Sequence, residues 1–416
     1  MSLKIERLGH HGDGIASGIA PGAGCAPVFV PLSLPGEEVE GEILGDRMVA
    51  PRIVTPSPDR VRPPCSHFKS CGGCAVQHAS DAFVETWKAG IVRAALAAQG
   101  LDAPIKGVVT SPPQSRRRAA LAGKRTKKAA MVGFHARGSG TLIEIPNCRL
   151  LLPQIVALMP ALRDLTVLAA SRKAEIGIAV TWSQAGADIA LSGAKPLDGP
   201  LRIEAAQFTL RHGIARLTWD GELIAQQRPP VQDFGGTGVV PPAGAFLQAT
   251  HEGQVALQNA VTEAVGVCKR VVDLFSGCGT FTLPLAHMAE VHAVESDPGM
   301  LAALDAGWRR GQGLRKVTTE ARDLFRRPLL PDELARFDAI VLDPPRAGAE
   351  AQTLEIARAD VPRIAAVSCN PASFARDAKI LIDAGYRLDW ITVVDQFRWS
   401  AHVELVAQFT KARAAR

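Results

Sequence analysis

The sequence predicts an α/β protein in which two β-rich regions precede a C-terminal domain built on a parallel sheet. From about residue 252 onward, short apolar runs alternate with helical stretches, which is typical of a parallel sheet with helices on both faces. A glycine-containing turn follows the first of these runs, as in Rossmann-like folds. Residues 1–57 instead contain short apolar runs between Gly and Pro turns, which favours a small β-barrel. We therefore expect three domains, at residues 1–57, 58–250 and 251–416.

Length and composition restrict the class of protein. The 416 residues are 47% hydrophobic, which is enough for several buried cores. No apolar run has the length of a membrane span, and the N-terminus lacks the apolar segment of a secretory signal. We expect a cytoplasmic monomer without membrane contact. Eight cysteines in such a protein indicate metal ligands, a nucleophile or core positions rather than disulfides.

Positive charge is concentrated in one region of the chain. The net charge is +6, but residues 61–150 carry fourteen basic and four acidic side chains, a local charge of +10. A solvated basic face is the simplest interpretation. The absence of any acid between Asp102 and Glu144 favours a polyanion such as a phosphate backbone. The residues predicted to contact its phosphates, and so to bind RNA if the polyanion is RNA, are Arg116, Arg117, Arg118, Lys124, Arg125, Lys127 and Lys128.

The region 58–250 begins with a cysteine cluster and a helix, and then becomes mainly β. Cys65, Cys71 and Cys74 follow a C-x5-C-x2-C spacing, and Cys148 is the candidate for a fourth ligand. Four thiolates are compatible with zinc or with an iron–sulfur cluster, and a single distant fourth ligand favours iron–sulfur. A helical pattern with apolar positions on one face then runs from Asp81 to Gln99.

The first turn of the C-terminal domain has the features of a nucleotide-type site. Asp273 to Thr280 contains two glycines, follows a buried run and precedes a helical stretch. A purely structural turn explains many isolated Gly-x-Gly sequences. In this chain Glu295 follows about 20 residues later, where an acid typically accepts hydrogen bonds from ribose hydroxyls. Because the turn has no P-loop lysine, an adenosine without a phosphate chain fits better, and S-adenosylmethionine is the common one.

A second polar turn follows a later strand. Asp343-Pro344-Pro345-Arg346 could be a proline turn with a capping carboxylate, or a loop that directs Asp343 toward the ligand. Methyltransferases that act on amino groups often carry an aromatic residue after the two prolines. Because Arg346 takes that place, amino-group methylation is the weaker interpretation.

Two further residues suggest a particular reaction. Cys369 follows the apolar run 364–367, and Glu404 begins the last one. Each has a structural alternative, as a buried small hydrophobe and as a solvated strand end. Together they suit methylation of carbon 5 of uracil. A thiolate that adds to carbon 6 makes carbon 5 nucleophilic, and a carboxylate then removes the carbon 5 proton.

These motifs resemble the RNA 5-methyluridine methyltransferases, and most of all the branch that acts on 23S ribosomal RNA. The matching segments are residues 5–14, the cysteine cluster, and residues 273–281, 343–348, 368–371 and 402–404. The resemblance implies an N-terminal TRAM barrel of the OB-like type, a class I methyltransferase domain with a Rossmann-like fold, and a 4Fe-4S cluster. It implies Cys369 as nucleophile and Glu404 as base. It implies S-adenosylmethionine binding by Gln248, Phe275, Thr280, Glu295, Asp323 and Asp343.

Three alternatives remain open at this point. The RNA could be a transfer RNA instead of ribosomal RNA, because the motifs do not select the target. The chain could be a non-catalytic iron–sulfur protein that binds RNA and keeps a methyltransferase fold. It could also methylate an amino group, a reaction that needs no cysteine.

Overall fold

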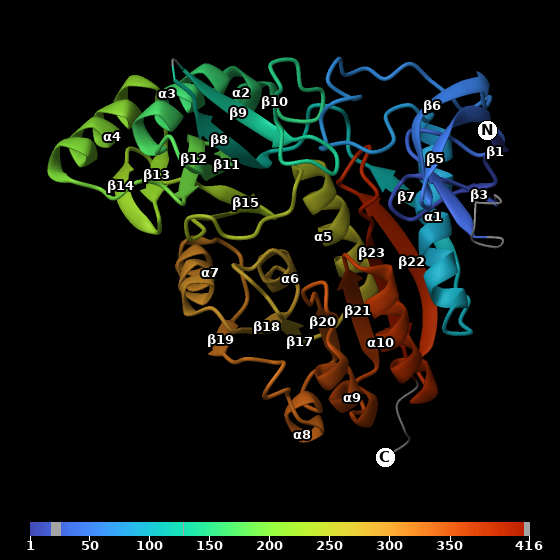
Figure 1. Cartoon of the computed structure of the whole chain (residues 1–416). Helices are drawn as coiled ribbons and strands as arrows, with labels where there is room; N and C mark the ends of the chain where they lie inside the picture. Colours follow the sequence, from blue (N-terminus) through green and yellow to red (C-terminus); the bar gives the residue numbers. More distant parts are fainter. Residues whose placement is uncertain (18–25, 128, 412–416) are drawn as a thin grey trace.

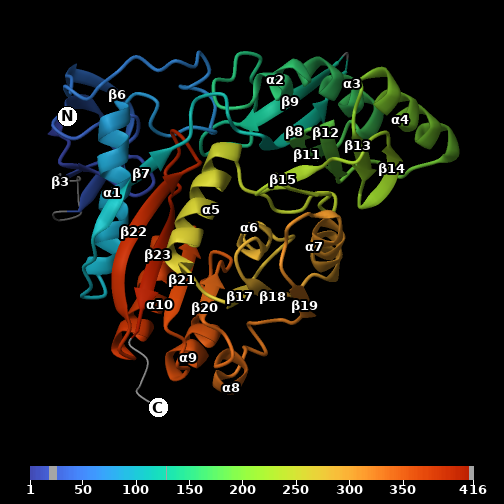
Figure 2. The same ribbon diagram turned by 180° about the vertical axis from the view of Figure 1, so that it is seen from behind.

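The computed structural model describes residues 1–17, 26–127 and 129–411. Its strands form three large sheets and one two-stranded sheet. Figures 1 and 2 show an N-terminal sheet and a central domain side by side, both placed above the C-terminal domain. None of the helices in the described ranges is long and apolar enough to cross a membrane.

The N-terminal sheet has six short strands in the order β1-β5-β6-β4-β3-β2. Its core is made by Ile5, Val28, Val30, Val39 and Met48, which are fully or almost fully buried. The sheet ends close to the boundary predicted at residue 57. Its strands are β1 (Ser2–Lys4), β2 (Arg7–Leu8), β3 (Gly14–Ser17), β4 (Pro27–Val30), β5 (Glu38–Leu44) and β6 (Arg47–Thr55).

The central domain is a seven-stranded sheet in the order β10-β9-β8-β11-β12-β13-β14, with helices packed on it. Its long strand β11 alternates buried and half-buried residues, so that Ile176, Ile178 and Val180 face the helices. The predicted mainly β character is confirmed. The elements are β8 (Arg118–Arg125), β9 (Ala130–His135), β10 (Leu142–Glu144), α2 (Pro153–Ala157), α3 (Met159–Ala169), β11 (Glu175–Ser183), β12 (Gly186–Ser192), α4 (Gly199–Arg211), β13 (Arg216–Trp219) and β14 (Glu222–Gln226).

The C-terminal domain contains the predicted alternation of strands and helices. Its eight-stranded sheet has the order β19-β18-β17-β20-β21-β23-β22-β7. A hairpin of β15 (Gln232–Phe234) and β16 (Thr237–Val239) precedes it. The other elements are α5 (His251–Val265), β17 (Arg270–Leu274), α6 (Thr282–Ala286), β18 (Glu290–Glu295), α7 (Pro298–Arg310), β19 (Val317–Ala321), α8 (Pro331–Leu334), β20 (Ala339–Leu342), α9 (Glu350–Arg358), β21 (Arg363–Ser368), α10 (Pro371–Asp383), β22 (Arg387–Asp395) and β23 (Glu404–Thr410).

The order of the strands determines where a ligand site can form. From β17 the chain moves outward through β18 and β19, and then returns to the other side of β17 with β20 and β21, all in parallel. β23 then lies antiparallel between β21 and β22. In open α/β sheets this reversal leaves a crevice at the carboxyl ends of the central strands.

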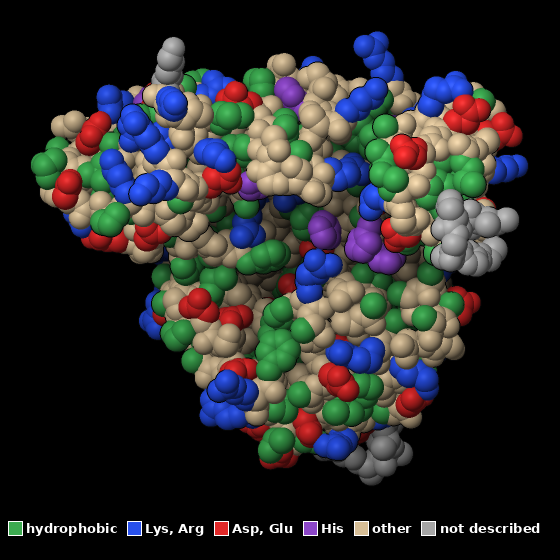
Figure 3. Space-filling view, in the orientation of Figure 1, with side chains coloured by type: hydrophobic (Ala, Val, Ile, Leu, Met, Phe, Trp, Pro, Cys, Tyr) green, Lys and Arg blue, Asp and Glu red, His purple; other side chains and the backbone are tan. Residues whose placement is uncertain are grey.

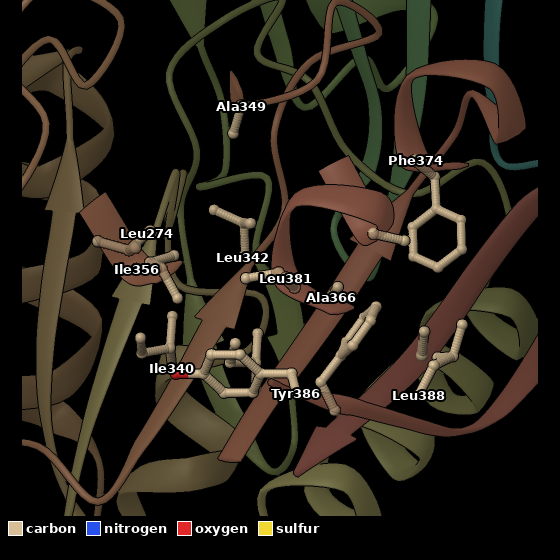
Figure 4. Close-up of a cluster of buried hydrophobic side chains, with 14 of the residues drawn as sticks. Leu274, Ile340, Leu342, Ala349, Ile356, Ala366, Phe374, Leu381, Tyr386 and Leu388 are labelled. Atoms are coloured by element: carbon tan, nitrogen blue, oxygen red, sulfur yellow. The ribbon is translucent and has the colours of Figure 1, made fainter. Parts of the chain in front are cut away.

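Helices cover both faces of this sheet, because successive residues of its buried strands point to opposite sides. Val272 and Leu274 pack on one face together with α9, α10 and α1 (Asp81–Ala97), whereas Val271 packs on the other face with α5, α6 and α7. Figure 4 shows part of the first of these cores, with Leu342 and Ala366 from two neighbouring strands and Phe374 and Leu381 from α10.

Helix α1 and strand β7 (Ile105–Thr110) correct the predicted domain division. Both lie in the range 58–250, but β7 pairs in parallel with β22, and Val92 and Leu96 of α1 are buried in the C-terminal core. The helix itself was predicted at Asp81–Gln99 and is observed at Asp81–Ala97, with Ser80 as its N-cap. Residues of the predicted central range therefore complete the C-terminal domain.

Residues 396–403 form the β22–β23 loop, which α1 and the cysteine segment hold in place. Lys88 of α1 is fully buried, pairs with Asp395, and donates to the carbonyl oxygens of Phe397 and His402 at 3.3 and 3.0 Å. The carbonyl oxygen of Trp399 accepts from the backbone N–H groups of residues 75 and 76 at 2.7 and 3.0 Å. Movement of the loop would leave the Lys88 charge buried without its partner, which is strongly destabilising. These contacts therefore restrict the loop.

A candidate active-site pocket at the carboxyl edge of the sheet

A pocket of about 470 Å³ lies at the carboxyl ends of the central strands. Its walls come from the loops after β17, β18, β19, β20 and β21, from the start of β23, and from the segment that joins the central domain to α5. The volume is in the usual range for small-molecule sites. In Figure 3 the surface is hollowed between the upper domains and the C-terminal domain, and Lys, Arg and His side chains gather along the hollow.

All of the residues predicted for cofactor binding and catalysis line this one pocket. They lie far apart in the sequence and on different elements, so only the tertiary fold brings them together. Which role each one has stays a prediction. The set is Gln248, Phe275, Thr280, Glu295, Asp323, Asp343, Cys369 and Glu404.

The turn after β17 has the shape that its glycines predict. Phe275 and Gly279 both have positive φ angles, of 64° and 98°. A Cβ atom on Gly279 would lie 2.1 Å from a methyl group of Leu304, so this position requires glycine. The Glu295 carboxylate accepts from the N–H of Gly277 at 3.1 Å. The acid predicted for ribose hydroxyls is therefore held directly beside the turn.

Phenylalanine rings form part of the pocket wall. Phe275 and Phe325 have ring centroids 5.4 Å apart, and both line the cavity. Phe325 and Phe246 are large exposed apolar side chains, with 49% and 59% of their surface accessible. Flat exposed rings beside a cavity are suited to stacking on a base.

Cys369 follows β21 and precedes α10, and hydrogen bonds fix both its own turn and the turn next to it. Asn370 caps the helix, and its side-chain Nδ2 donates to the carbonyl oxygen of Arg346 at 2.8 Å. The Ser373 hydroxyl donates to the same oxygen at 3.1 Å. The Pro-Pro turn that follows Asp343 and the turn that carries Cys369 are thereby locked together.

Electrostatics in the pocket disfavours negative charge. Burial, followed by the Glu404 and Asp343 carboxylates, raises the pKa of the Cys369 thiol to about 11, and Arg346 opposes this shift. Burial and the neighbouring Asp273 raise the pKa of Asp343 to about 7. The pocket therefore favours a ligand that brings positive charge.

Glu404 is not the solvated strand end that was the alternative interpretation. Only 4% of its surface is accessible. Burial and the Asp343 carboxylate raise its pKa to about 8, and the hydrogen bond from Gln396 opposes this. A carboxyl group whose pKa lies near neutrality is suited to accept a proton.

Gln396 is a residue that the sequence analysis missed. It is 1% exposed and its Nε2 donates to both Glu404 and Gln248. A polar pair, Asp395-Gln396, at the carboxyl end of the apolar strand β22 was the available signal.

Arg117 corrects the predicted set of RNA-contacting residues. It is 6% exposed, and its guanidinium donates to the side chains of Gln232 and Gln254 and to the carbonyl oxygen of Gln248. With its donors directed into the protein, Arg117 connects the central domain to the pocket wall and is not available to a phosphate.

The other predicted basic residues do not form one surface. Arg118 and Arg116 lie near the pocket, over the rings of Phe246 and Phe397 at 5.0 and 5.4 Å. Lys124 is close to the other end of β8, roughly 20 Å away at strand spacing, and pairs with Glu175. Arg125 ends the same strand and the exposed Lys127 follows it, and Lys128 lies outside the described residues.

Further cationic and aromatic side chains surround the entrance. His402 is exposed and lies edge-on to Phe397, with ring centroids 5.5 Å apart. The part of the His402 ring that faces the protein is desolvated, which lowers its pKa, and the nearby charges of Arg346, Lys88 and Arg116 act in the same direction. Such a rim is suited to phosphates and bases of a polynucleotide.

The four cysteines of the predicted cluster line one small cavity between the segment after the N-terminal sheet and β9. Burial, together with the neighbouring thiols of the other three cysteines, raises the pKa of Cys74 to about 12. Backbone N–H groups donate to the sulfur atoms of Cys71 and Cys148, each at 3.4 Å. Among the described residues, no group of three or more His, Cys, Asp or Glu side chains is arranged to hold a metal ion. The thiols are thus gathered, and the metal remains a prediction.

Comparisons with known proteins identify a family profile for the C-terminal part and relatives over almost the whole chain. The profile of the family described as tRNA (Uracil-5-)-methyltransferase matches residues 312–411. An RNA methyltransferase of Mesorhizobium japonicum is 44% identical over 100% of this chain and 99% of its own length. One of Brucella suis is 42% identical over 99% and 98%. The 23S rRNA (uracil(1939)-C(5))-methyltransferase RlmD of Shewanella piezotolerans is 32% identical over 98% and 95%.

One solved structure is similar over its full length. It is the Pyrococcus abyssi tRNA (uracil-54, C5)-methyltransferase in complex with S-adenosyl-L-homocysteine. The TM-score is 0.74 at 22% identity, and 99% of each chain is covered. The similarity extends through all three parts of the fold, from the N-terminal sheet to β23.

Proposed function

We propose that this chain, which belongs to the RNA (uracil-5-)-methyltransferase family, methylates carbon 5 of a uridine in RNA. In this proposal Cys369 is the nucleophile and Glu404 is the base. Its class I methyltransferase fold is that of the Pyrococcus protein. The observation that carries the proposal is the presence of a thiol and a buried carboxyl group in the pocket beside the glycine turn.

The pocket residues fit S-adenosylmethionine by charge and shape. Phe275 offers a ring for adenine, and Glu295 and Asp323 offer acceptors for hydroxyl and ammonium groups. Gln248, Thr280 and Asp343 complete the proposed set. When bound, this sulfonium compound supplies the methyl group for carbon 5.

The protein contributes two groups to the covalent chemistry. Cys369 reacts as the thiolate, after its thiol proton has been lost: the sulfur adds to carbon 6 of the uracil, and the electron pair of the ring double bond moves to carbon 5, which becomes the methyl acceptor. Glu404 then takes the carbon 5 proton, the double bond forms again, and the bond between carbon 6 and sulfur breaks. The thiolate is released unchanged. Glu404 is suited to this step because its raised pKa makes it a stronger base than an exposed carboxylate.

We further propose that the RNA is ribosomal. The similarity to RlmD supports this, because that relative is named for a uridine of 23S ribosomal RNA and is 32% identical over nearly its whole length. The transfer RNA alternative is supported by the Pyrococcus protein, which is named for a uracil of transfer RNA and is 22% identical to this chain. In the ribosomal reading, the N-terminal sheet is a TRAM-like barrel, and the rim around Arg116, Arg346 and His402 contacts the RNA beside the target uridine.

Nucleoside analysis tests this function directly. The purified protein, S-adenosylmethionine, and either 23S ribosomal RNA or transfer RNA free of 5-methyluridine are incubated and digested to nucleosides. We expect 5-methyluridine in the ribosomal sample. 5-Methyluridine in the transfer RNA sample alone would overturn the target, and RNA binding without any methylated nucleoside would support the non-catalytic alternative.

We also propose that Cys65, Cys71, Cys74 and Cys148 hold a 4Fe-4S cluster. The four thiols line one cavity, where burial and neighbouring thiols raise the pKa of Cys71, Cys74 and Cys148, and cationic iron stabilises the ionised thiolates. Protein purified without oxygen is expected to contain about four iron atoms and four sulfides per chain and to show visible absorption. A colourless protein that contains stoichiometric zinc would contradict the cluster and would show that the four thiols form a zinc site. Cys268→Ser, outside the cluster, is the matched control for Cys148→Ser, which we expect to lower the iron content.

A further inference from the structure

Gln396 lies at the centre of a buried hydrogen-bond network between the two halves of the pocket. Its Nε2 donates to the Oε2 atom of Glu404 and to the Oε1 atom of Gln248. Its Oε1 accepts from the N–H of Ala249 at 2.6 Å. A single amide thus touches the residue proposed as base and one proposed to bind the methyl donor.

The orientation of this amide is determined by chemistry. A backbone N–H can only donate, so the atom of Gln396 that faces Ala249 must be the carbonyl oxygen. The NH2 group must then face Glu404 and Gln248. The Oε1 atom of Gln248 accepts the hydrogen bond from Gln396. Gln248 therefore presents its side-chain NH2 group, which is a hydrogen-bond donor, to the pocket.

The network also acts on the ionisation of Glu404, because the hydrogen bond from Gln396 lowers its pKa. One carboxylate oxygen is occupied by Gln396, which leaves the other for a proton. A hydrogen bond from a neutral donor favours the charged form of a carboxyl group. The charged or titratable groups that act on Glu404 are Asp343 and Cys369, which both oppose its ionisation when they are negative. Gln396 therefore counteracts the field of the pocket.

Close packing and a neighbouring ion pair restrict the position of Gln396. A Cβ atom on Gly253 of α5 would lie 2.5 Å from the Cβ atom of Gln396. The preceding residue, Asp395, is anchored by Lys88. Gln396 therefore packs directly on a helix that has no side chain at that point, and it follows a residue fixed by a buried ion pair.

We propose that Gln396 is a positioning residue for the removal of the carbon 5 proton, and that it joins this step to Gln248 in the donor site. The inference rests on the proposed function. The residue acts through Glu404 and does not itself contact the uracil, so its loss affects breakdown of the covalent adduct more than its formation.

The test compares formation and breakdown of the adduct in Gln396→Leu. With RNA that contains 5-fluorouridine at the target site, we expect the variant to form the Cys369 adduct at close to the wild-type rate. With normal RNA, we expect turnover to fall by about tenfold or more and the methylated adduct to accumulate. The loss of the hydrogen bond raises the pKa of Glu404, so the acid limb of the pH–rate profile is expected to move to higher pH.

Two further variants keep the test decisive. Gln352 is a fully buried glutamine that donates to and accepts from Leu329, outside the pocket, so Gln352→Leu is the matched control for loss of a buried amide. Gly253→Ala displaces Gln396 without removing its amide, and thermal unfolding of each variant identifies loss of folding. We expect Gly253→Ala, but not Gln352→Leu, to show adduct accumulation and the shifted pH profile.

The outcomes separate this inference from the proposed function. If wild-type protein forms neither 5-methyluridine nor an adduct with 5-fluorouridine, the proposed function itself fails. If wild-type protein does both and Gln396→Leu lowers the two rates equally without a shift in pH dependence, the role is structural and the inference is overturned.

Discussion

Replacing Cys369 with Ala is expected to lower the rate of 5-methyluridine formation by a factor of about 10⁴ or more. Carbon 5 of uracil is too weak a nucleophile to accept a methyl group unless a thiolate has first added to carbon 6. Among the other described cysteines, only Cys278 lines the same pocket, and burial raises the pKa of its thiol to about 12. The measurement is methyl transfer to RNA, together with a band of reduced mobility in denaturing gels when the RNA contains 5-fluorouridine.

Cys268→Ala is the matched control for this experiment. Cys268 lies between α5 and β17, packs against the core of α5 to α7, and lies outside the pocket, so we expect it to retain activity and adduct formation. Full activity of Cys369→Ala would contradict the proposed reaction and would favour methylation of an amino group.

Replacing Glu404 with Gln is expected to stop the reaction after methyl transfer. The amide keeps the shape of the side chain but cannot accept the carbon 5 proton, so the methylated uridine stays attached to Cys369. Loss of a general base typically lowers turnover by a factor of about 10² to 10⁴. With S-adenosylmethionine labelled in the methyl group and normal RNA, the variant should carry label into a covalent protein–RNA band.

The pH dependence of the wild type provides a second check. Glu404 acts as a base only when it is ionised, and its pKa is raised to about 8 by burial and by Asp343. The rate of adduct breakdown is therefore expected to increase as the pH rises through about 8. Multiple turnover by Glu404→Gln, or a breakdown rate that is flat across this range, would remove Glu404 from the role of base.

Much of the C-terminal domain was predictable from local sequence patterns. Runs such as 339–342 and 364–367 are apolar and short, and turns and helical stretches separate them. A strand that is buried on both faces must be apolar throughout, so its position can be read from the chain. The residues proposed for chemistry lie at the ends of these runs, where the fold class places its ligands.

The assignment of α1 and β7 was not predictable in this way. Both precede the central domain in sequence and were assigned to it, but β7 pairs with β22, nearly 300 residues later. Strand pairing over such separations depends on which sheet edge remains open after the rest has folded, and local periodicity contains no information about that. The buried pair of Lys88 and Asp395 belongs to the same long-range contact.

The sequence by itself determined which groups are available for chemistry and where along the chain they occur, because motifs such as those around Cys369 and Glu404 are local. Only the tertiary structure decided which of them are buried and what they contact. Arg117 lies between two arginines near the pocket entrance, yet the fold turns it inward onto glutamines of distant elements. Gln396 resembled an ordinary loop residue until the fold placed it between Gln248 and Glu404. The physical reason is that burial and hydrogen bonding between distant segments depend on packing of whole elements, whereas side-chain chemistry depends on the residue alone.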